Sequence, residues 1–292
     1  MFYYQGFGLC IASYIDFPEL FPVAACEKAD VIVQIGKIPS IPQGDSFCTG
    51  RITHYVNDKE IMFTVKDIAS YHISGGNMIV VHPENDHVES RTLRLFVLAG
   101  AMAAILQQRN IIPMHAAAVI KDGALTLISG RSGAGKSTTL AGLMAQKYRV
   151  FSDDITVLTG NGNATASYPM IKLWEQSMQS LNLSNRTFPV MPGMEKYGVF
   201  FHEHFDTRDY PVAKIILLKV EEHFAVKRLT GGKAFAEIVQ HIYKPSFFNT
   251  PEMCVLKFRT LTQLLQKTEV YEVARPESCS PTELLSRVTA LI

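Results

Sequence analysis

Residues 130–137, GRSGAGKS, match the phosphate-loop pattern GxxxxGK[ST] at every required position. Glycines in such a loop let backbone N–H groups turn toward phosphate oxygens, and the helix that follows adds its N-terminal dipole. Lys136 is expected to reach the β- and γ-phosphates of ATP, and the Ser137 hydroxyl to bind Mg²⁺. The alternative is a glycine-rich turn with a solvated lysine, and the apolar strand before the loop and the helix candidate after it argue against that alternative. The residues predicted to bind the nucleotide are Gly130, Arg131, Ser132, Gly133, Ala134, Gly135, Lys136, Ser137 and Thr138.

Two adjacent aspartates, Asp153 and Asp154, follow the loop and its helix at the end of a predicted strand, YRVF. One carboxylate beside a phosphate loop can hold Mg²⁺, and a second can accept the proton of an attacking hydroxyl. Two like charges this close also raise one of the two pKa values, which suits a general base. For the pair taken alone, a solvated turn between strands is the alternative. The intact loop nearby favours the catalytic interpretation.

The elements that must position these residues predict an α/β fold in two parts. Residues 1–88 contain short strands and are expected to form a small β-rich domain, followed by an ATP-binding domain over residues 89–292 with a mixed sheet flanked by helices. Ser90 is expected to cap a helix that ends near Asn110. The apolar face of this helix comprises Leu93, Phe96, Val97, Ala101 and Ala104. Hairpins are expected between residues 51–56 and 60–65, and between residues 70–74 and 77–82 around Gly75 and Gly76.

The segment 161–209 is rich in Asn, Ser and Pro and predicts an irregular lid or substrate loop. Lys196 in this segment has two interpretations, a cation that reaches a transferring phosphoryl group or an ordinary solvated lysine. Trp174 is the only tryptophan and is expected in the core, with substrate contact as the alternative. Further along, Thr250 and Ser280 are expected to begin two helices, each with proline at the first helical position.

The composition is that of an ordinary folded protein, with 292 residues, 47% apolar and 19% charged, and a net charge of +1. This charge balance predicts neither a nucleic-acid nor a membrane-surface binder. The most apolar run, residues 95–106, is far shorter than the roughly 20 residues that cross a bilayer, so it predicts a buried helix. Five scattered cysteines predict no disulfide framework and favour a reducing cytosol. No signal peptide is evident, and a cytoplasmic protein is expected.

Together, MHAAAVI, the strand after it, GRSGAGKSTT and VFSDD resemble the C-terminal domain of HPr kinase/phosphorylase, a bacterial protein serine kinase. The resemblance covers residues 111–160 with specific motifs and residues 90–290 more loosely. It implies that His115, Asp153 and Asp154 assist phosphoryl transfer, with Asp153 as the base and Asp154 as a metal ligand, although the two roles stay open. Where that family commonly has an acidic residue after the loop serine, this chain has Thr138, and this difference leaves reverse phosphorolysis open.

Three segments of the N-terminal half are YYQGFGLCIASYIDFPEL, DVIVQIGKIP and FVLAGAMAAILQQRNIIPMHAAAV. This half is more similar to stand-alone kinase-like proteins from lasso-peptide gene clusters, which phosphorylate a serine near the C-terminus of a precursor peptide. The sequence therefore predicts an Mg-ATP-dependent kinase, with Lys136, Asp153 and His115 catalytic and with Ser137 and Asp154 at the metal. The expected acceptor is a serine of a peptide or small protein, and a homo-oligomer is an open option. Two alternatives remain: a regulatory module that hydrolyses ATP without an acceptor, and a small-molecule kinase.

Overall fold

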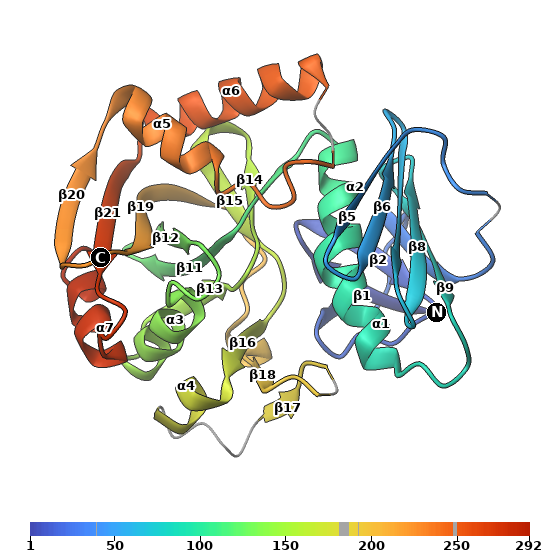
Figure 1. Cartoon of the computed structure of the whole chain (residues 1–292), viewed down its shortest axis with the longest axis horizontal. Coiled ribbons are helices and arrows are strands. Elements are labelled where there is room, and N and C mark those ends of the chain that lie inside the picture. Colours follow the sequence, from blue (N-terminus) through green and yellow to red (C-terminus); the bar gives the residue numbers. More distant parts are fainter. Residues whose placement is uncertain (39, 181–186, 192, 248–249) are drawn as a thin grey trace.

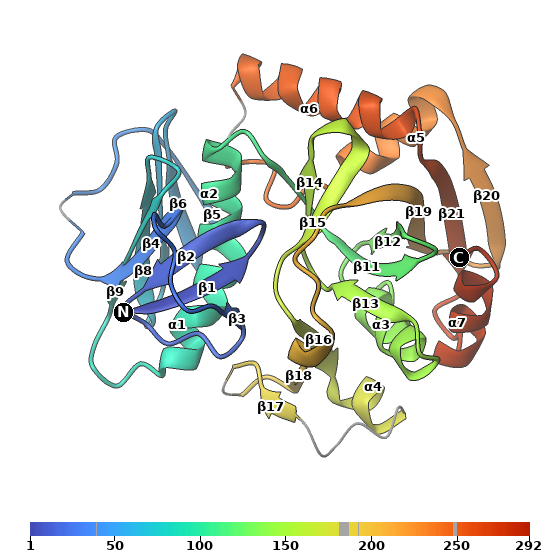
Figure 2. The same cartoon turned by 180° about the vertical axis from the view of Figure 1, so that it is seen from behind.

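The computed structural model describes residues 1–292 except 39, 181–186, 192 and 248–249. Over this described part of the chain, the strands form two nine-stranded sheets and one three-stranded sheet. Figure 1 shows the first large sheet at one end of the molecule and the second at the other, and Figure 2 shows the same arrangement from behind. The predicted α/β class with a mixed sheet is confirmed. That the second half is a kinase domain of the HPr type stays a prediction.

The first sheet uses residues 2–83 in the strand order β3-β1-β2-β4-β9-β8-β7-β6-β5. Its strands are β1 Phe2–Gly6, β2 Leu9–Ser13, β3 Phe21–Pro22, β4 Val31–Ile35, β5 Asp45–Thr49, β6 Ile52–Val56, β7 Glu60–Val65, β8 Ala69–Ser74 and β9 Met78–Pro83. Both expected hairpins are present, because β6 pairs antiparallel with β7 and β8 with β9. Gly75 and Gly76 have φ values of 60° and 66°, which glycine adopts at little cost, and they make the turn of the second hairpin.

A single helical segment lies between the two large sheets, as both Figure 1 and Figure 2 show. It consists of α1 Ser90–Phe96, a π-helical turn Val97–Ala101 and α2 Met102–Gln108. Its expected apolar face is buried, except for Phe96, which is partly buried. Gly100 lies so close to the ring of Phe63 that an added Cβ would come within 3.0 Å of it. The helix and the first sheet therefore share one apolar core.

The predicted cap at Ser90 is wrong. The N-cap is Glu89, which has the extended backbone of a capping residue, so Ser90 is already the first helical residue and Glu89 makes no side-chain cap hydrogen bond. The division of the chain at residue 88 stays a prediction.

The second sheet carries the phosphate-loop motif. Its strands are β10 Ile112–Met114, β11 Ala116–Lys121, β12 Ala124–Gly130, β13 Arg149–Ser152, β14 Thr156–Thr159, β15 Asn163–Ala166, β19 Tyr210–Val220, β20 Ala225–Leu229 and β21 Glu269–Arg275. Strand β12 is parallel to β19, which is parallel to β21, so the carboxyl ends of these three strands lie at one edge of the sheet. Ligands of open α/β sheets bind at such an edge.

Four helices pack around this sheet: α3 Lys136–Ala145, α5 Gly231–Val239, α6 Pro251–Leu265 and α7 Pro281–Thr289. The two expected helix starts are confirmed. The hydroxyl of Thr250 accepts a hydrogen bond from the N–H of Met253, and that of Ser280 accepts one from the N–H of Glu283. These caps satisfy N–H groups that the first turn of each helix leaves without a partner.

The segment 161–209 is more regular than its composition suggests, so the prediction of an irregular loop is wrong for most of it. Residues 181–186 and 192 lie outside the described residues. In the rest, β16 Met170–Trp174, β17 Thr187–Pro189 and β18 Lys196–Phe200 form the three-stranded sheet, and α4 covers Glu175–Ser180. Strand β16 is almost wholly buried, which explains its order: Ile171 and Leu173 belong to the apolar core beside α3.

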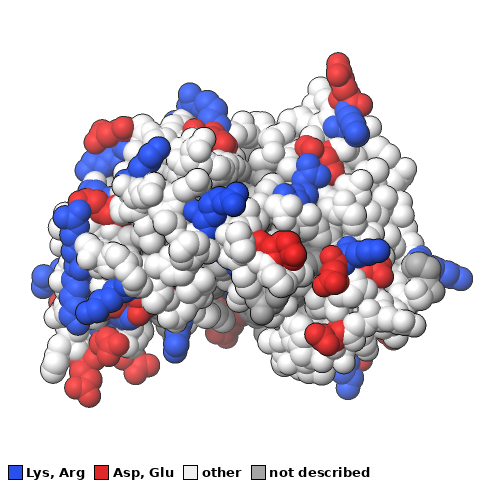
Figure 3. Space-filling model, turned by 90° about the horizontal axis from the view of Figure 1, so that it is seen from above, with Lys and Arg blue, Asp and Glu red and all other residues white. Residues whose placement is uncertain are grey.

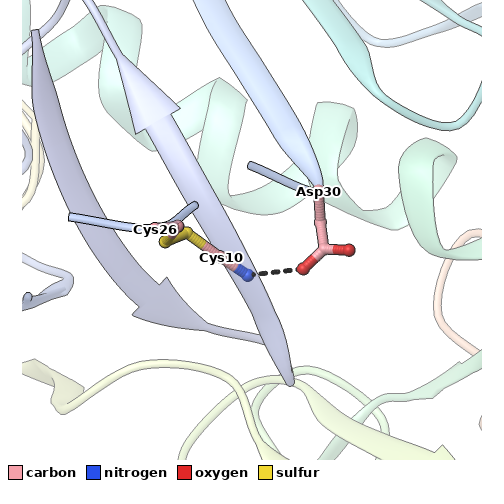
Figure 4. Close-up of a disulfide and its surroundings, with 3 residues drawn as sticks. All are labelled: Cys10, Cys26 and Asp30. Atoms are coloured by element: carbon pink, nitrogen blue, oxygen red, sulfur yellow. Dashed lines mark hydrogen bonds between the residues drawn. A yellow bond between two sulfur atoms is a disulfide. The ribbon is translucent and has the colours of Figure 1, made fainter. Parts of the chain in front are cut away.

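A disulfide joins Cys10 of β2 to Cys26 in the loop between β3 and β4, and the cysteine pattern did not predict it. Figure 4 shows this pair beside Asp30, whose carboxylate accepts a hydrogen bond from the backbone N–H of Cys10 at 2.9 Å. The two cysteines are 16 residues apart, so sequence spacing gave no signal of their approach. The argument from cysteine usage to a reducing compartment therefore loses its basis.

Positive and negative side chains are interspersed on the face shown in Figure 3, and much of that face is uncharged. This distribution agrees with the net charge of +1. Among the helices that the structure describes, none combines the length and apolar character needed to cross a bilayer.

Candidate active site

The loop between β12 and α3 has the backbone that phosphate binding requires. Gly130, Gly133 and Gly135 have φ values of 153°, 83° and 109°, a region that side chains other than glycine rarely adopt. A Cβ at Gly130 would also come within 2.6 Å of the Leu218 carbonyl oxygen. The expected order of strand, glycine-rich loop and helix is present, and the tip residues Arg131, Ser132 and Gly133 are exposed.

Lys136 is only 7% exposed, and its ammonium group donates hydrogen bonds to the carbonyl oxygens of Gly130 at 2.7 Å and Arg131 at 3.2 Å. The Lys136 side chain thus folds back over the loop. This loop is expected to bind the phosphates that Lys136 would contact. Burial lowers the pKa of Lys136, and the nearby carboxylates of Asp154 and Asp153 counter that shift. An anionic ligand at the loop would add the negative charge that a buried ammonium needs.

Asp153 lies directly after β13 and is 1% exposed. One of its carboxylate oxygens accepts a hydrogen bond from the Ser137 hydroxyl at 3.0 Å, and the other accepts one from the backbone N–H of Lys172 at 2.9 Å. Burial raises the pKa of Asp153, and the adjacent charge of Asp154 raises it further. A buried carboxylate whose surroundings disfavour its ionised form therefore lies beside the Ser137 hydroxyl at the start of α3.

Asp154 faces a different environment. Its carboxylate lies 2.8 Å from the ammonium of Lys172 and 3.6 Å from Nε2 of His115, and 24% of its side chain is exposed. Burial alone would raise the pKa of Asp154, but the charge of Lys172 and, at low pH where its ring is protonated, that of His115 hold the pKa well below its usual range. The φ of 66° at Asp154 is uncommon for a residue other than glycine. Such backbone strain is often found at functional sites.

His115 lies between β10 and β11, where its backbone N–H donates to the carbonyl of His241 at 2.7 Å and its carbonyl accepts from the Ser129 hydroxyl at 2.6 Å. The ring packs edge-on against that of Tyr243, with 5.5 Å between ring centroids. Burial lowers the pKa of His115 to about 4, and the charge of Lys136 contributes to this shift. The imidazole is therefore neutral at pH 7.

The structure brings His115, Lys136, Ser137, Asp153 and Asp154 into one connected cluster at the edge of the second sheet. Thr138, the last of the predicted loop residues, is oriented elsewhere. Its hydroxyl lies 2.8 Å from that of Ser177 on α4. The catalytic and binding roles of all these residues remain predictions.

Lys172 on β16, which is 5% exposed, was not among the residues predicted from the sequence. Its ammonium donates a hydrogen bond to Asp154, and its backbone N–H donates one to Asp153. Burial would lower the pKa of Lys172, but the charge of Asp154, Tyr168 and Tyr243 nearby and the hydrogen bond to Asp154 together raise it well above its usual value. A lysine at the centre of an apolar strand, MIKLW, was the available signal.

Arg275, at the end of β21, was also missed. Its guanidinium donates hydrogen bonds to the carbonyl oxygens of Ala134 and Gly133, each at 3.1 Å, and so links the loop to the third parallel strand. These carbonyls belong to the loop itself, so the arginine fixes the backbone that is expected to contact phosphate.

Trp174 and Lys196 are partners in the register of β16 and β18, and the lysine ammonium lies 5.6 Å from the centroid of the indole. The expectation that Trp174 lies in the core is wrong, since it is 50% exposed at the end of its strand. The charge of Lys196 acts to lower the pKa values of Lys136, Asp153 and Asp154. Lys196 therefore lies near the cluster.

The residues present fit an ATP–Mg²⁺ site. Backbone N–H groups of a loop with three glycines in the left-handed region, a buried ammonium and a helix N-terminus all favour a polyphosphate. The hydroxyl of Ser137 and the carboxylate of Asp153 are oxygen donors of the kind that Mg²⁺ prefers.

A scan against models of known protein families finds no match, and a search of curated proteins finds none with significant similarity. Among solved structures, the Hpr(Ser) kinase/phosphatase from Coxiella burnetii is similar with a TM-score of 0.28 and 13% sequence identity, over 61% of this chain and 96% of that chain. A likeness of this degree carries no argument about function.

Proposed function

We propose that this protein is an Mg-ATP-dependent kinase that transfers the γ-phosphoryl group to a serine hydroxyl of a peptide or small protein. The observation that supports this proposal best is that two adjacent aspartates beside the loop have different contacts and different exposure to solvent. Asp153 is buried against Ser137, whereas Asp154 is partly exposed and faces His115 and Lys172. A protein that only binds nucleotide needs a carboxylate beside Ser137 for the metal. It does not need a second, partly exposed carboxylate beside a histidine and a lysine.

The contacts favour exchanging the two roles that the resemblance assigned. In phosphate-loop enzymes Mg²⁺ is held by the loop Ser or Thr together with an acidic residue from a neighbouring strand. Asp153 makes the contact with Ser137, so Asp153 and Ser137 would hold the metal. Asp154, whose side chain is 24% exposed and makes no contact with Ser137, would accept the proton of the acceptor hydroxyl. This role is supported by the position of Asp154 and not by its pKa, because a lowered pKa makes a carboxylate a weaker base.

The surrounding residues would orient and balance these groups. Lys136 would contact the terminal phosphates, and bound Mg-ATP supplies the phosphoryl group for transfer. Lys172 fixes the position of Asp154 through a 2.8 Å ion pair and that of Asp153 through its backbone. The neutral ring of His115 would hold the carboxylate of Asp154 toward the acceptor or receive the proton from it.

Two features beside this cluster support a peptide as the acceptor. Trp174 is half exposed next to Lys196, and aromatic rings of this kind bury large apolar area at recognition surfaces. The short edge strand β17 lies on the same three-stranded sheet, and an edge strand can pair with an extended peptide. The resemblance noted above makes the precursor of a lasso peptide the first acceptor to test.

The test is incubation of the protein with Mg²⁺, γ-labelled ATP and candidate precursor peptides, followed by mass spectrometry of the peptides. The expected product carries one phosphoryl group on a serine, and a peptide with that serine replaced by alanine stays unlabelled. Slow release of inorganic phosphate with no labelled acceptor would instead support the regulatory ATPase. Labelling of a metabolite would support a small-molecule kinase.

A further inference from the structure

A pocket of about 500 Å³ opens beside the phosphate loop, between the loop, the end of β19 and the end of α5. Loop residues Arg131, Ser132 and Ala134 form one wall. The opposite walls are formed by Leu218, Lys219, Val220 and Glu221 from β19 and its end, and by Glu237, Gln240 and His241 from α5 and the residues after it. The predicted catalytic residues His115, Lys136, Ser137, Asp153 and Asp154 are not among its lining residues.

The strand order separates this pocket from the catalytic cluster. Strands run β19-β12-β11-β13, so β12, which leads into the loop, has β19 on one side and β11 followed by β13 on the other. The aspartates follow β13, whereas the pocket lies over the end of β19. If a polyphosphate is held along the loop with its terminal phosphate beside Asp153 and Asp154, its other end would lie on the β19 side of β12, where the pocket is.

The lining has the mixed chemistry of a small-molecule site. Leu218 and Val220 offer apolar surface, and Val220 is 47% exposed although it is a large hydrophobic residue. Glu221 and Gln240 are exposed polar side chains on opposite walls. Lys219 is neutralised by Glu237 at 3.0 Å and Glu272 at 2.7 Å, so it presents no free charge that would select an anion.

We propose that this pocket binds the nucleoside part of the triphosphate, with Val220 against a face of the base and the polar groups of Gln240 and Glu221 available to the base edge and the ribose hydroxyls. A base has flat apolar faces and polar edges, and the ribose adds hydroxyls, so the nucleoside matches a lining with apolar and polar walls. The volume lies in the range of about 300–1,000 Å³ that small-molecule pockets occupy. The inference rests on the proposed function, because it assumes that the loop holds the phosphates.

The test compares ATP with inorganic triphosphate, which occupies the loop but has no nucleoside. Val220→Trp fills the pocket from the β19 side at a position that is already exposed. The matched control is Val226→Trp on β20, since Val226 is 46% exposed and lies outside the pocket lining. In Val220→Trp the Kd for Mg-ATP is expected to rise about tenfold or more, a change of roughly 1.4 kcal/mol. The Kd for inorganic triphosphate should stay as in the unmodified protein, and Val226→Trp should change neither value.

A second variant, Gln240→Trp, enters the pocket from the residue that follows α5 and should produce the same selective loss, so the test does not depend on one substitution. Equal weakening of ATP and triphosphate in both variants would overturn the inference, as would unchanged ATP binding with a raised KM for the peptide acceptor. The proposed function fails in a different way. In that case the unmodified protein binds neither ligand, or it binds Mg-ATP but labels no acceptor.

Discussion

The hydroxyl of Ser137 donates a 3.0 Å hydrogen bond to Asp153, whereas the neighbouring Asp154 turns to Lys172 on a different sheet. Two carboxylates that are adjacent in the chain thus contact different side chains, although the backbone N–H of Lys172 also donates to Asp153. This separation makes their proposed roles distinguishable by experiment.

Asp154→Asn should retain Mg-ATP binding and lower kcat by about 10²-fold or more, the usual scale for loss of a general base. Asp153→Asn should instead raise the Mg²⁺ concentration that gives half-maximal activity, because an amide is a weaker ligand than a carboxylate. Mg²⁺ titrations of phosphoryl transfer by both variants separate the effects, with thermal unfolding as a control that each variant is folded. The opposite pattern would restore the first assignment, in which Asp153 is the base.

Lys136→Ala removes the ammonium that lies against the loop carbonyls. We expect kcat to fall by about 10²–10³-fold, the scale for removal of one electrostatic stabiliser of the transition state. Nucleotide binding should weaken much less, because the backbone N–H groups remain. Calorimetric titration with Mg-ATP and a transfer assay measure the two effects, and normal turnover in this variant would refute the loop assignment.

His115→Asn tests whether the ring positions Asp154. The expected result is a kcat about 10- to 100-fold lower, as seen for residues that orient a functional group, with an unchanged Kd for Mg-ATP. The matched control is His72→Asn, because His72 pairs with Glu60 on the remote first sheet, at 2.7 Å. If both variants turn over at the unmodified rate, His115 has a structural role.

Arg275→Ala removes the two hydrogen bonds to the loop backbone. The KM for ATP should rise by about tenfold, since loss of hydrogen bonds from a charged group costs about 1.5–3 kcal/mol and part of this is recovered from water. Arg275→Lys should rescue only partly, because lysine lacks the planar fork of donors. Arg228→Ala on the adjacent β20, which removes an exposed ion pair with Glu269, is the control and should leave this KM unchanged.

Asp206 offers a pH-dependent test of stability. It accepts hydrogen bonds from Arg208 at 2.7 Å, Tyr210 at 2.6 Å and Arg149 at 2.6 Å, and the hydrogen bonds from Arg208 are the main reason that its pKa lies well below the usual range. A depressed folded pKa stabilises the protein above the unfolded value of about 3.9, and this contribution is lost as the pH falls through the folded pKa.

Asp206→Asn should therefore lower the free energy of unfolding at pH 7 by about 1 kcal/mol, a modest value because both arginines are well exposed. The difference from the unmodified protein should shrink as the pH falls below about 4. Denaturant unfolding at several pH values measures it, with Asp67→Asn as the control because the Asp67–Arg51 pair is exposed on both sides. A difference that is constant with pH would contradict the electrostatic explanation.

The features that sequence analysis predicted well depend on local information. The loop from Gly130 to Ser137 and the caps at Thr250 and Ser280 are set by residues a few positions apart. Lys172 meets Asp154 across 18 residues and Arg275 meets Ala134 across 141 residues, contacts that only the packing of separate strands creates. Strand β16 was missed for a related reason: it is short, and its order comes from burial against α3 rather than from any alternating pattern of its own.

The helical segment between the two large sheets has a consequence for how the molecule opens. Residues Ala101 to Leu106 are at most 1% exposed, and they share a core with the first sheet and with Ile155 and Tyr168 of the other half. Amide hydrogens there cannot reach solvent by local fraying, so they should exchange only through global unfolding and be among the slowest in native-state hydrogen exchange. The two halves, joined through this segment, are expected to melt as one cooperative unit, and exchange at these amides would measure the stability of the whole chain.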